Sequence, residues 1–250
     1  IRDDLVTGVQ TCALPILAFT GPEATGKSTL VESIVTWLGE NFKVDNFHMG
    51  KPKPSIITLP FAFSAPLFKI IFANQKNTFT IKNKKQNKES KFIYSNKSVI
   101  LALDRYRQSL KVFKKSKNGS IVICDRWPSD EIGKMDSARI IPPISSSIKS
   151  RLISFLSSIE KKYYNKIKNP DLIISLTVSP KTAVLRNSSR NKINKETSSY
   201  VLERHKKNMM PSFKFSNKKI LNTDDSKNNS ILEAKRIIWS QIVRKNKIEE

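Results

Sequence analysis

The sequence has no long hydrophobic run and almost no cysteine. No apolar stretch approaches the roughly 20 residues that a bilayer-spanning helix needs, so we do not expect a membrane protein. Only two cysteines occur, and one of them, Cys12, falls in a terminal segment that is considered separately below. Cys124 alone cannot close an internal disulfide, which agrees with a reducing compartment. We therefore expect a cytoplasmic protein without membrane partners.

Acidic residues are also scarce, since 21 Asp and Glu stand against 45 Lys and Arg and give a formal net charge of +24. Such a charge suits a nucleic-acid-binding protein. However, sites that bind phosphates by a bidentate fork or read bases rely on Arg, and only 11 of the basic residues are Arg. No aromatic residues that could stack on bases are interleaved with the basic ones. Lys, Asn and Ile all have A/T-rich codons, so compositional drift accounts for them together. We favour a solvated lysine surface over a specific nucleic-acid site, which stays an alternative.

What the sequence does contain is one complete phosphate-binding motif. Residues 21–29, GPEATGKST, fill every fixed position of the pattern G-x-x-x-x-G-K-[ST]. Glycine admits backbone angles that a Cβ forbids, so successive N–H groups can point at phosphate oxygens. In this pattern the lysine reaches the β/γ-phosphates and the serine hydroxyl binds Mg²⁺, while the next helix directs its positive end at the anion. The predicted cofactor-binding residues of the loop are Gly21, Glu23, Ala24, Thr25, Gly26, Lys27, Ser28 and Thr29.

The residues around the motif match the strand–loop–helix setting that its mechanism needs. Leu17–Thr20 is a short apolar run that suits a buried strand, and residues 28–38 repeat apolar side chains at helical spacing before Gly39. The alternative is a chance match in an ordinary glycine turn, and this setting argues against it. We therefore predict that the protein binds ATP together with Mg²⁺.

The first sixteen residues resemble a translated sequencing-library adapter. The resemblance covers residues 1–3 and 6–16, and residues 4–5 stand where a barcode would fall. On this hypothesis the native chain begins near Leu17 and lacks part of its first strand. A genuine N-terminus is the alternative.

Strands and helices are predicted to alternate along the rest of the chain. Further strands are expected at residues 43–49, 120–125, 171–178 and 219–222. Helices are expected at 93–117, at 145–168, from 180, in a segment that ends at 205, and at 231–245. This alternation predicts an α/β fold of the P-loop NTPase type, with a three-layer arrangement in which a parallel sheet of about five strands carries helices on both faces. We expect one domain over residues 17–250, with a Lys/Asn-rich surface excursion near 74–91 and a lid near 186–197.

In such sheets, ligands bind beyond the carboxyl ends of the strands. Lys51, Asp125 and Thr223 are expected at that edge together with the phosphate loop. Asp125 is placed to hold the magnesium shell or to take a proton from an acceptor, and Arg126 to fork onto an acceptor phosphate. A structural ion pair at the strand end is the alternative.

Two other basic groups are less specific. Arg105 and Arg107 lie two residues apart on a predicted helix and face different ways, so spacing alone favours an ordinary surface role for each. A basic loop after the fourth strand can close over ATP, or it can be a plain solvated loop. Its candidate catalytic residues are Arg186, Arg190, Lys192 and Lys195, and the sequence does not choose among them.

From Leu17 onward, the order of these segments resembles the thymidylate kinase family. Besides the phosphate loop, the matching strings are A-L-D-R at 102–105, I-C-D-R-W at 123–127 and L-N-T-D at 221–224. The resemblance implies that Glu23 contacts a sugar hydroxyl of the acceptor, that Arg105 lies near its base, and that Arg126 binds its phosphate. It implies five catalytic residues, namely Lys27, Asp125, Arg126, Arg186 and Arg190. The remaining implied sites are acceptor binding by Glu23, Lys51, Arg105 and Arg126, adenine contacts from Asn222 and Thr223, and metal binding by Ser28 and Asp125.

The chain departs from the family pattern in several places, including the segment after Trp127, which is unlike the usual acceptor-site segment. The family's R-E-P-G turn is absent and residues 50–52 stand in its place, while Ala24 and Thr25 offer no basic side chain in the loop. A catalytic arginine would therefore come from the lid. The activity implied is ATP-dependent phosphoryl transfer to a small nucleotide, most readily dTMP, by a chain that forms a homodimer. The alternatives are a kinase of the same fold that acts on a nucleoside or sugar, and a P-loop ATPase or switch protein with no acceptor.

Overall fold

The computed structural model describes residues 13–53, 88–145, 147–189, 196–206, 209–213 and 217–248. The chain forms two compact units, and each is described by itself. The first unit takes in Ile1–His48, Leu110–Trp127 and Asn169–Glu250, and the second takes in Met49–Ser109 and Pro128–Lys168. That residues 17–250 make up one domain stays a prediction.

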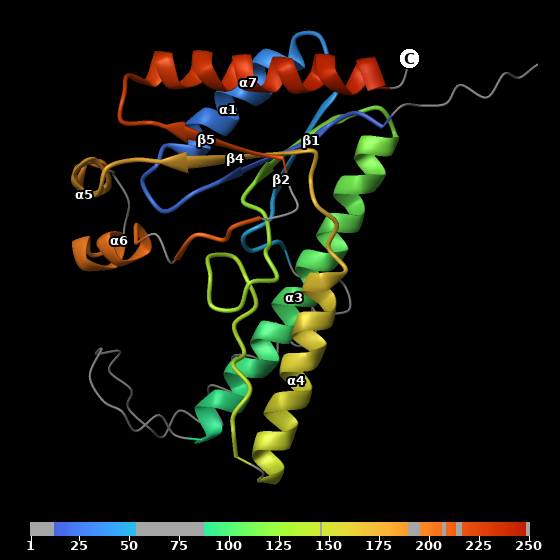
Figure 1. Cartoon of the computed structure of the whole chain (residues 1–250), viewed down its shortest axis with the longest axis vertical. Coiled ribbons are helices and arrows are strands. Elements are labelled where there is room, and N and C mark those ends of the chain that lie inside the picture. The colour runs from blue at the N-terminus through green and yellow to red at the C-terminus, as the bar shows by residue number, and fades with distance from the viewer. Residues whose placement is uncertain are drawn as a thin grey trace, which may run out of the picture. The chain divides into compact units, whose positions relative to one another are not determined.

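The first unit is built on a five-stranded parallel sheet (Figure 1). Its strands are β1 (Ile16–Thr20), β2 (Val44–His48), β3 (Ile121–Asp125), β4 (Leu172–Thr177) and β5 (Lys218–Asn222). They are hydrogen-bonded in the order β2-β3-β1-β4-β5, which places β1 at the centre, and all neighbouring strands pair parallel. The prediction of a parallel sheet of about five strands is confirmed.

Two helices cover one face of this sheet, namely α1 (Lys27–Gly39) and α7 (Lys227–Ile248), which lie side by side in Figure 1. The central strand β1 is buried along its whole length, and alternate residues of each strand point to the helices. The buried core on this face consists of Leu17, Phe19, Leu30, Val31, Ile34, Leu38, Ile121, Ile123, Leu172, Ile174, Leu176, Leu221, Ala234, Ile238 and Ile242. The helical members recur every three or four residues, so each helix presents one apolar stripe to the sheet.

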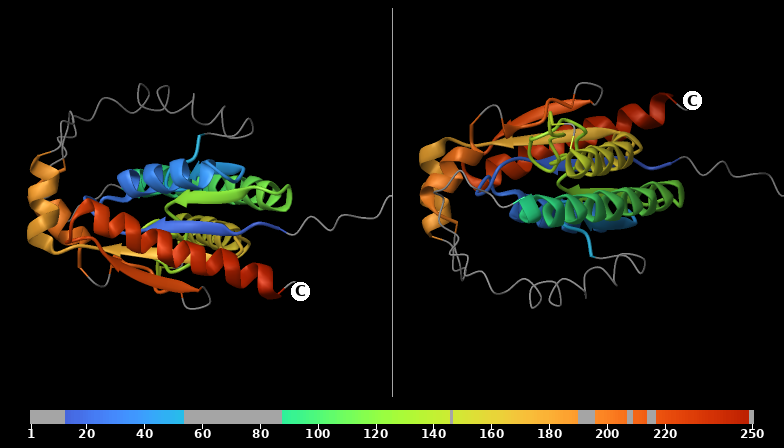
Figure 2. Two further views of the ribbon diagram at one scale, coloured as in Figure 1. Left: turned by 90° about the horizontal axis from the view of Figure 1, so that it is seen from above. Right: turned by 90° about the horizontal axis from the view of Figure 1, so that it is seen from below.

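Three of the other helices begin where a side chain can satisfy one of their first N–H groups. Ser147, Ser179 and Thr197 each accept a hydrogen bond from the backbone N–H three residues later. They precede α4 (Ile148–Asn165), α5 (Pro180–Ser188) and α6 (Ser198–Arg204) respectively. Figure 2 shows α5 and α6 side by side at one end of the sheet. None of the described helices combines the length and apolar character that crossing a bilayer requires.

Two sequence-based boundaries need correction. Helix α3 (Lys88–Lys117) takes in residues 88–91, which were predicted to belong to the Lys/Asn-rich excursion, because lysine and glutamate favour helix. Residues 74–87 of that excursion lie outside the described part of the chain. Arg186 was predicted in a basic loop but belongs to the last turn of α5. Residues 190–195 of the predicted lid also lie outside the described part.

The second unit is held together around a buried arginine. Helix α4 and the part of α3 up to Ser109 run in the same direction (Figure 1). Arg105 has an exposed fraction of 0% and donates from Nη1 to the Tyr164 hydroxyl at 2.6 Å and from Nη2 to Asp136 Oδ1 at 3.0 Å. Its Nε and Nη2 also donate to the carbonyl oxygen of Gly50 at 3.1 Å and 2.5 Å. A single guanidinium therefore joins four segments of this unit.

The phosphate loop leaves β1 so close to β4 that Gly21 has no room for a side chain. Its φ is +146°, and an added Cβ would lie 2.6 Å from the backbone oxygen of Leu176. We expect Gly21→Ala to lower the free energy of unfolding by about 2 kcal/mol or more, because both the backbone angle and the contact become strained. Urea unfolding monitored by circular dichroism measures this change.

Gly39→Ala is the matched control. This glycine lies at the end of α1, and an added Cβ would meet no atom within 4 Å. Its replacement should leave stability unchanged or raise it by up to about 1 kcal/mol, since alanine favours helix. Equal losses in the two variants would contradict the close approach of the loop to β4.

Candidate nucleotide-binding site

The loop between β1 and α1 has the backbone of a phosphate nest. Ala24 and Gly26 adopt left-handed angles, with φ of 64° and 81°. Helix α1 has no acidic residue in its first turn and no side-chain cap on its first N–H groups. These N–H groups and the positive end of the helix dipole therefore face the loop without a built-in negative partner, which suits an anion.

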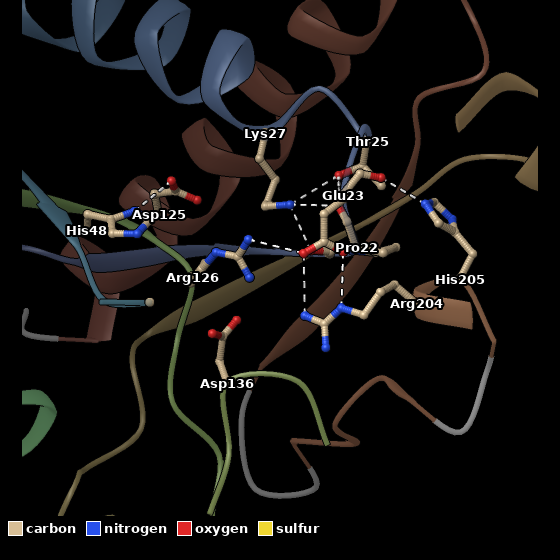
Figure 3. A network of polar contacts seen from close by, with 12 residues as sticks. Pro22, Glu23, Thr25, Lys27, His48, Asp125, Arg126, Asp136, Arg204 and His205 are labelled. Carbon is tan, nitrogen blue, oxygen red and sulfur yellow. Dashed lines mark hydrogen bonds and ion pairs between the residues drawn. The ribbon is translucent and has the colours of Figure 1, made fainter. Parts of the chain in front are cut away.

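The Lys27 side chain folds back onto the backbone of this loop (Figure 3). Its ammonium is buried and donates to the carbonyl oxygens of Gly21 and Pro22, at 2.7 Å each. The Thr25 hydroxyl also donates to Pro22 O at 3.0 Å. The lysine charge thus lies inside the ring of the loop, where it can neutralise a bound phosphate.

Asp125 ends β3 directly beside the loop. Its Oδ2 lies 2.9 Å from Nδ1 of His48, the last residue of β2, and an ionised carboxylate only accepts, so Nδ1 carries the proton. Burial by itself raises the pKa of Asp125, but the hydrogen bond and charge of His48 and the charges of Lys27 and Arg126 offset it and hold the pKa below its usual value. Asp125 therefore remains ionised at neutral pH.

The oxygen atoms at this edge fit a magnesium ion. Asp125 Oδ1 is buried and has no hydrogen-bond partner among the described residues, while Ser28 is exposed on the first turn of α1. No group of three or more His, Cys, Asp or Glu gathers in the part of the chain that the structure describes. Magnesium does not need such a group, since it usually takes one or two carboxylates together with substrate phosphates and water.

A cavity of about 280 Å³ opens on the other side of the loop. It is lined by Ala24, Thr25, Gly26, Thr29, Leu30, Arg186, Ser189, Thr223, Asp225, Lys227, Ser230 and Ile231. Arg186 donates from Nη2 to the Thr223 carbonyl at 2.6 Å, and the Thr223 hydroxyl lies 3.0 Å from the Thr25 carbonyl. The cavity therefore lies between the phosphate loop, the end of α5 and the segment after β5, with apolar, positive and negative side chains in its wall.

The Glu23 side chain lies between two arginines, on the side of the loop away from this cavity (Figure 3). Arg204, the last residue of α6, donates from Nε to Glu23 Oε2 at 3.1 Å, and Arg126 Nη2 lies 3.6 Å from Oε1. His205 Nε2 donates to the Glu23 carbonyl at 2.8 Å. Burial alone raises the pKa of Glu23, but the hydrogen bond and charge of Arg204 and the charge of Arg126 lower it below its usual value.

The structure thus brings together most of the residues expected at one site. The residues of the first unit that surround the loop are Gly21, Glu23, Ala24, Thr25, Gly26, Lys27, Ser28, Thr29, Asp125, Arg126, Arg186 and Thr223. Asn222 is exposed and does not line the cavity beside the loop; its side chain accepts from the Asp224 N–H at 3.0 Å. Lys51, which is exposed, and the buried Arg105 belong to the second unit. Arg190, Lys192 and Lys195 lie outside the described residues.

Three contacts were not anticipated from the sequence. His48 pairs with Asp125, and both Arg204 and His205 form hydrogen bonds with Glu23. No sequence motif points to any of these three partners. The only signal was position, because His48 lies one residue before the end of a predicted strand and Arg204 and His205 lie at the end of the predicted helix after the lid. Nothing in their spacing relates them to the phosphate loop.

No protein-family model and no curated protein sequence matches the chain. Among solved structures, the chain is similar to a thymidylate kinase from Ehrlichia chaffeensis, with a TM-score of 0.42 and 16% sequence identity. The similarity covers 90% of this chain and 98% of that one.

The Glu23 ion pairs predict a stability difference that depends on pH. A carboxyl whose folded-state pKa is lowered stabilises the fold above its unfolded-state pKa, and this contribution is lost as the pH falls through the folded-state pKa. Glu23→Gln should therefore lower the free energy of unfolding by about 1.5–3 kcal/mol at pH 7, and the difference should disappear in acid. Thermal unfolding of both proteins across pH 3–8 measures it.

Glu233→Gln serves as the control. Glu233 pairs with Arg236 at 3.6 Å on the exposed surface of α7, where an ion pair contributes little. This variant should match the parent protein across the whole pH range. A Glu23→Gln difference that stays constant with pH would contradict the ion-pair explanation.

Proposed function

We propose that the protein is an ATP-dependent kinase that transfers the γ-phosphoryl group of Mg-ATP to a nucleoside monophosphate, with dTMP as the leading acceptor. The observation that carries the proposal is the pairing of a complete phosphate loop with a second positive group on the same side of the sheet. Lys27 lies inside the loop, and Arg126 and Arg204 lie against Glu23 of that loop. Phosphoryl transfer from ATP to an acceptor that is itself a phosphate ester needs two anion sites of this kind, one for each substrate.

The donor side of the proposal is supported by the loop and by the cavity beside it. The N–H groups of the loop and Lys27 would hold the β- and γ-phosphates of ATP. The cavity of about 280 Å³ would receive the adenine and ribose, with Arg186 and Thr223 in its wall. In this arrangement the base would lie on the α5 side of the loop and the terminal phosphate would point toward Asp125.

Ser28 and Asp125 are the residues that would hold magnesium. When bound, the ion neutralises charge that develops on the phosphates during transfer. Asp125 is kept ionised by its neighbours, and His48 fixes the orientation of its carboxylate through Oδ2, so Oδ1 stays available to a ligand.

The acceptor side of the proposal rests on Arg126. Its backbone N–H donates to the Phe19 carbonyl at 2.7 Å and its φ is 73°, an uncommon angle for a residue with a side chain. The side chain is thereby held beside the phosphate loop, where it would bind the acceptor phosphate, and Glu23 would face the acceptor sugar. The roles of Lys51, Arg105 and the lid residues stay predictions, as do a homodimer and a cytoplasmic location.

Charge distinguishes this function from the two alternatives. A nucleoside or sugar acceptor carries no anion for Arg126, and an acceptor-free ATPase needs no second positive group beside the loop. The choice of dTMP among monophosphates depends on the motif order that resembles thymidylate kinases.

Lys27→Ala is expected to lower turnover by about 100-fold or more, because it removes a positive charge that acts on the transferred phosphoryl group. A coupled assay of ADP release at saturating ATP and dTMP measures this, with circular dichroism to check the fold. Lys235→Ala is the control, since Lys235 lies on α7 over the ring of Trp37. Unchanged turnover in the Lys27 variant would refute the kinase assignment.

A panel of acceptors tests the second substrate. We expect ADP release to be fastest with dTMP, slower with other nucleoside monophosphates, and no faster with thymidine or a hexose than with ATP alone. The dTMP–thymidine pair isolates the contribution of the phosphate. ATP loss that no member of the panel accelerates would instead favour an ATPase, and acceleration by thymidine or a hexose would favour the other kinase.

A further inference from the structure

Glu23 brings together three separate parts of the chain. Its carboxylate belongs to the phosphate loop, Arg126 follows β3, and Arg204 ends α6, yet both guanidinium groups lie on this one side chain. Arg204 contributes two donors, Nε to Oε2 at 3.1 Å and Nη2 to Oε1 at 3.5 Å. The geometry is a fork onto a carboxylate, the same fork that arginine uses for phosphate.

The group is shielded but still reachable from solvent. The side chains of Glu23, Arg126 and Arg204 have exposed fractions of 13%, 20% and 18%. At this depth water screens the charges only in part, so a small anion from solution would feel both arginines strongly. By contrast, the Arg105 side chain in the second unit has an exposed fraction of 0%.

Glu23 is one carboxylate that contacts two guanidinium groups. Lys27 adds a third positive charge on the same loop, and Asp125, on which the charges of Lys27 and Arg126 act, adds a second carboxylate, so three cations stand against two carboxylates among these five side chains. A phosphate monoester carries up to two negative charges and three acceptor oxygens, so it matches two arginines better than a single carboxylate does.

The position of Arg204 is also set by contacts that do not involve the Glu23 carboxylate. Thr197 caps the start of α6, and His205 donates to the Glu23 carbonyl at 2.8 Å directly after the helix ends. The ring of Tyr200 lies 5.9 Å from the Arg204 guanidinium, one turn back on α6. Arg204 would therefore remain beside the loop if the Glu23 side chain turned away.

We propose that Arg126 and Arg204 together form the seat of the acceptor phosphate, and that the Glu23 carboxylate occupies this seat until the acceptor displaces it. The inference rests on the proposed function, because it concerns the second substrate of the same site. It adds Arg204 as a substrate-binding residue and makes Glu23 a competitor of the acceptor phosphate.

Inorganic phosphate is the probe, since it carries no sugar hydroxyl that Glu23 could bind. The loop is first saturated with magnesium and the β,γ-imido analogue of ATP, so that added phosphate cannot enter the donor site. Calorimetric titration then gives the phosphate affinity of each variant. Arg204→Gln should weaken it by about 10- to 100-fold, because a charge-assisted fork is lost.

Glu23→Gln should strengthen phosphate binding several-fold, since the neutral amide competes less well for the arginines. The double variant with Arg204→Gln should bind as weakly as Arg204→Gln alone. Arg204→Lys, which keeps the charge without the fork, should fall between the parent and Arg204→Gln, and it replaces that variant if the latter does not fold.

Arg236→Gln is the matched control, because Arg236 is exposed on α7 and pairs only with Glu233 among the ion pairs of the described residues. It should leave the phosphate affinity unchanged, and an equal loss would show a general charge effect and overturn the proposal. Unchanged affinity in Arg204→Gln, or weaker binding in Glu23→Gln, would also overturn it. A parent protein that fails to bind the ATP analogue would instead refute the kinase assignment, so the two failures are distinguishable.

Discussion

The parallel pairing of β1 with β3 is the constraint on which the site depends. Phe19 stands opposite Asp125 in this register, and the Phe19 carbonyl accepts the Arg126 N–H at 2.7 Å. Parallel strands end at the same edge of a sheet, so the phosphate loop after β1 and the Asp-Arg pair after β3 emerge together. If the register of β3 shifted by one residue, the Asp125 side chain would point to the other face of the sheet. Its hydrogen bond with His48 on β2 would then be lost.

Positive charge beside the loop is organised in two groups with different partners. Lys27 and the first N–H groups of α1 face the inside of the loop, whereas Arg126 and Arg204 meet on Glu23 at its outer side. The lowered pKa values of Glu23 and Asp125 follow from this surplus of cations, which outweighs the burial of each carboxyl. The overall charge of +24 is therefore less informative about function than these few partly buried contacts.

Local patterns predicted the fold well and the site in part. The nine residues GPEATGKST indicated strand, loop and helix, and the buried run before Asp125 indicated a strand that ends in a carboxylate; both elements are present. The predicted ends of helices were less accurate: α3 begins at Lys88 and not at residue 93, and Arg186 lies in a helix and not in a loop. Lysine and arginine are compatible with both loop and helix, so composition alone does not decide where such a helix begins or ends.

The sequence by itself determined the phosphate loop and the parallel sheet, because both depend on short-range requirements. Glycines at fixed spacing permit the nest, and apolar runs alternating with amphipathic helices require buried parallel strands. Only the tertiary structure decided which charged groups meet. Glu23 and Arg204 are 181 residues apart in the chain, and His48 and Asp125 are 77 apart. Such contacts follow from strand order and from the end of α6 at the loop, and no local pattern encodes them.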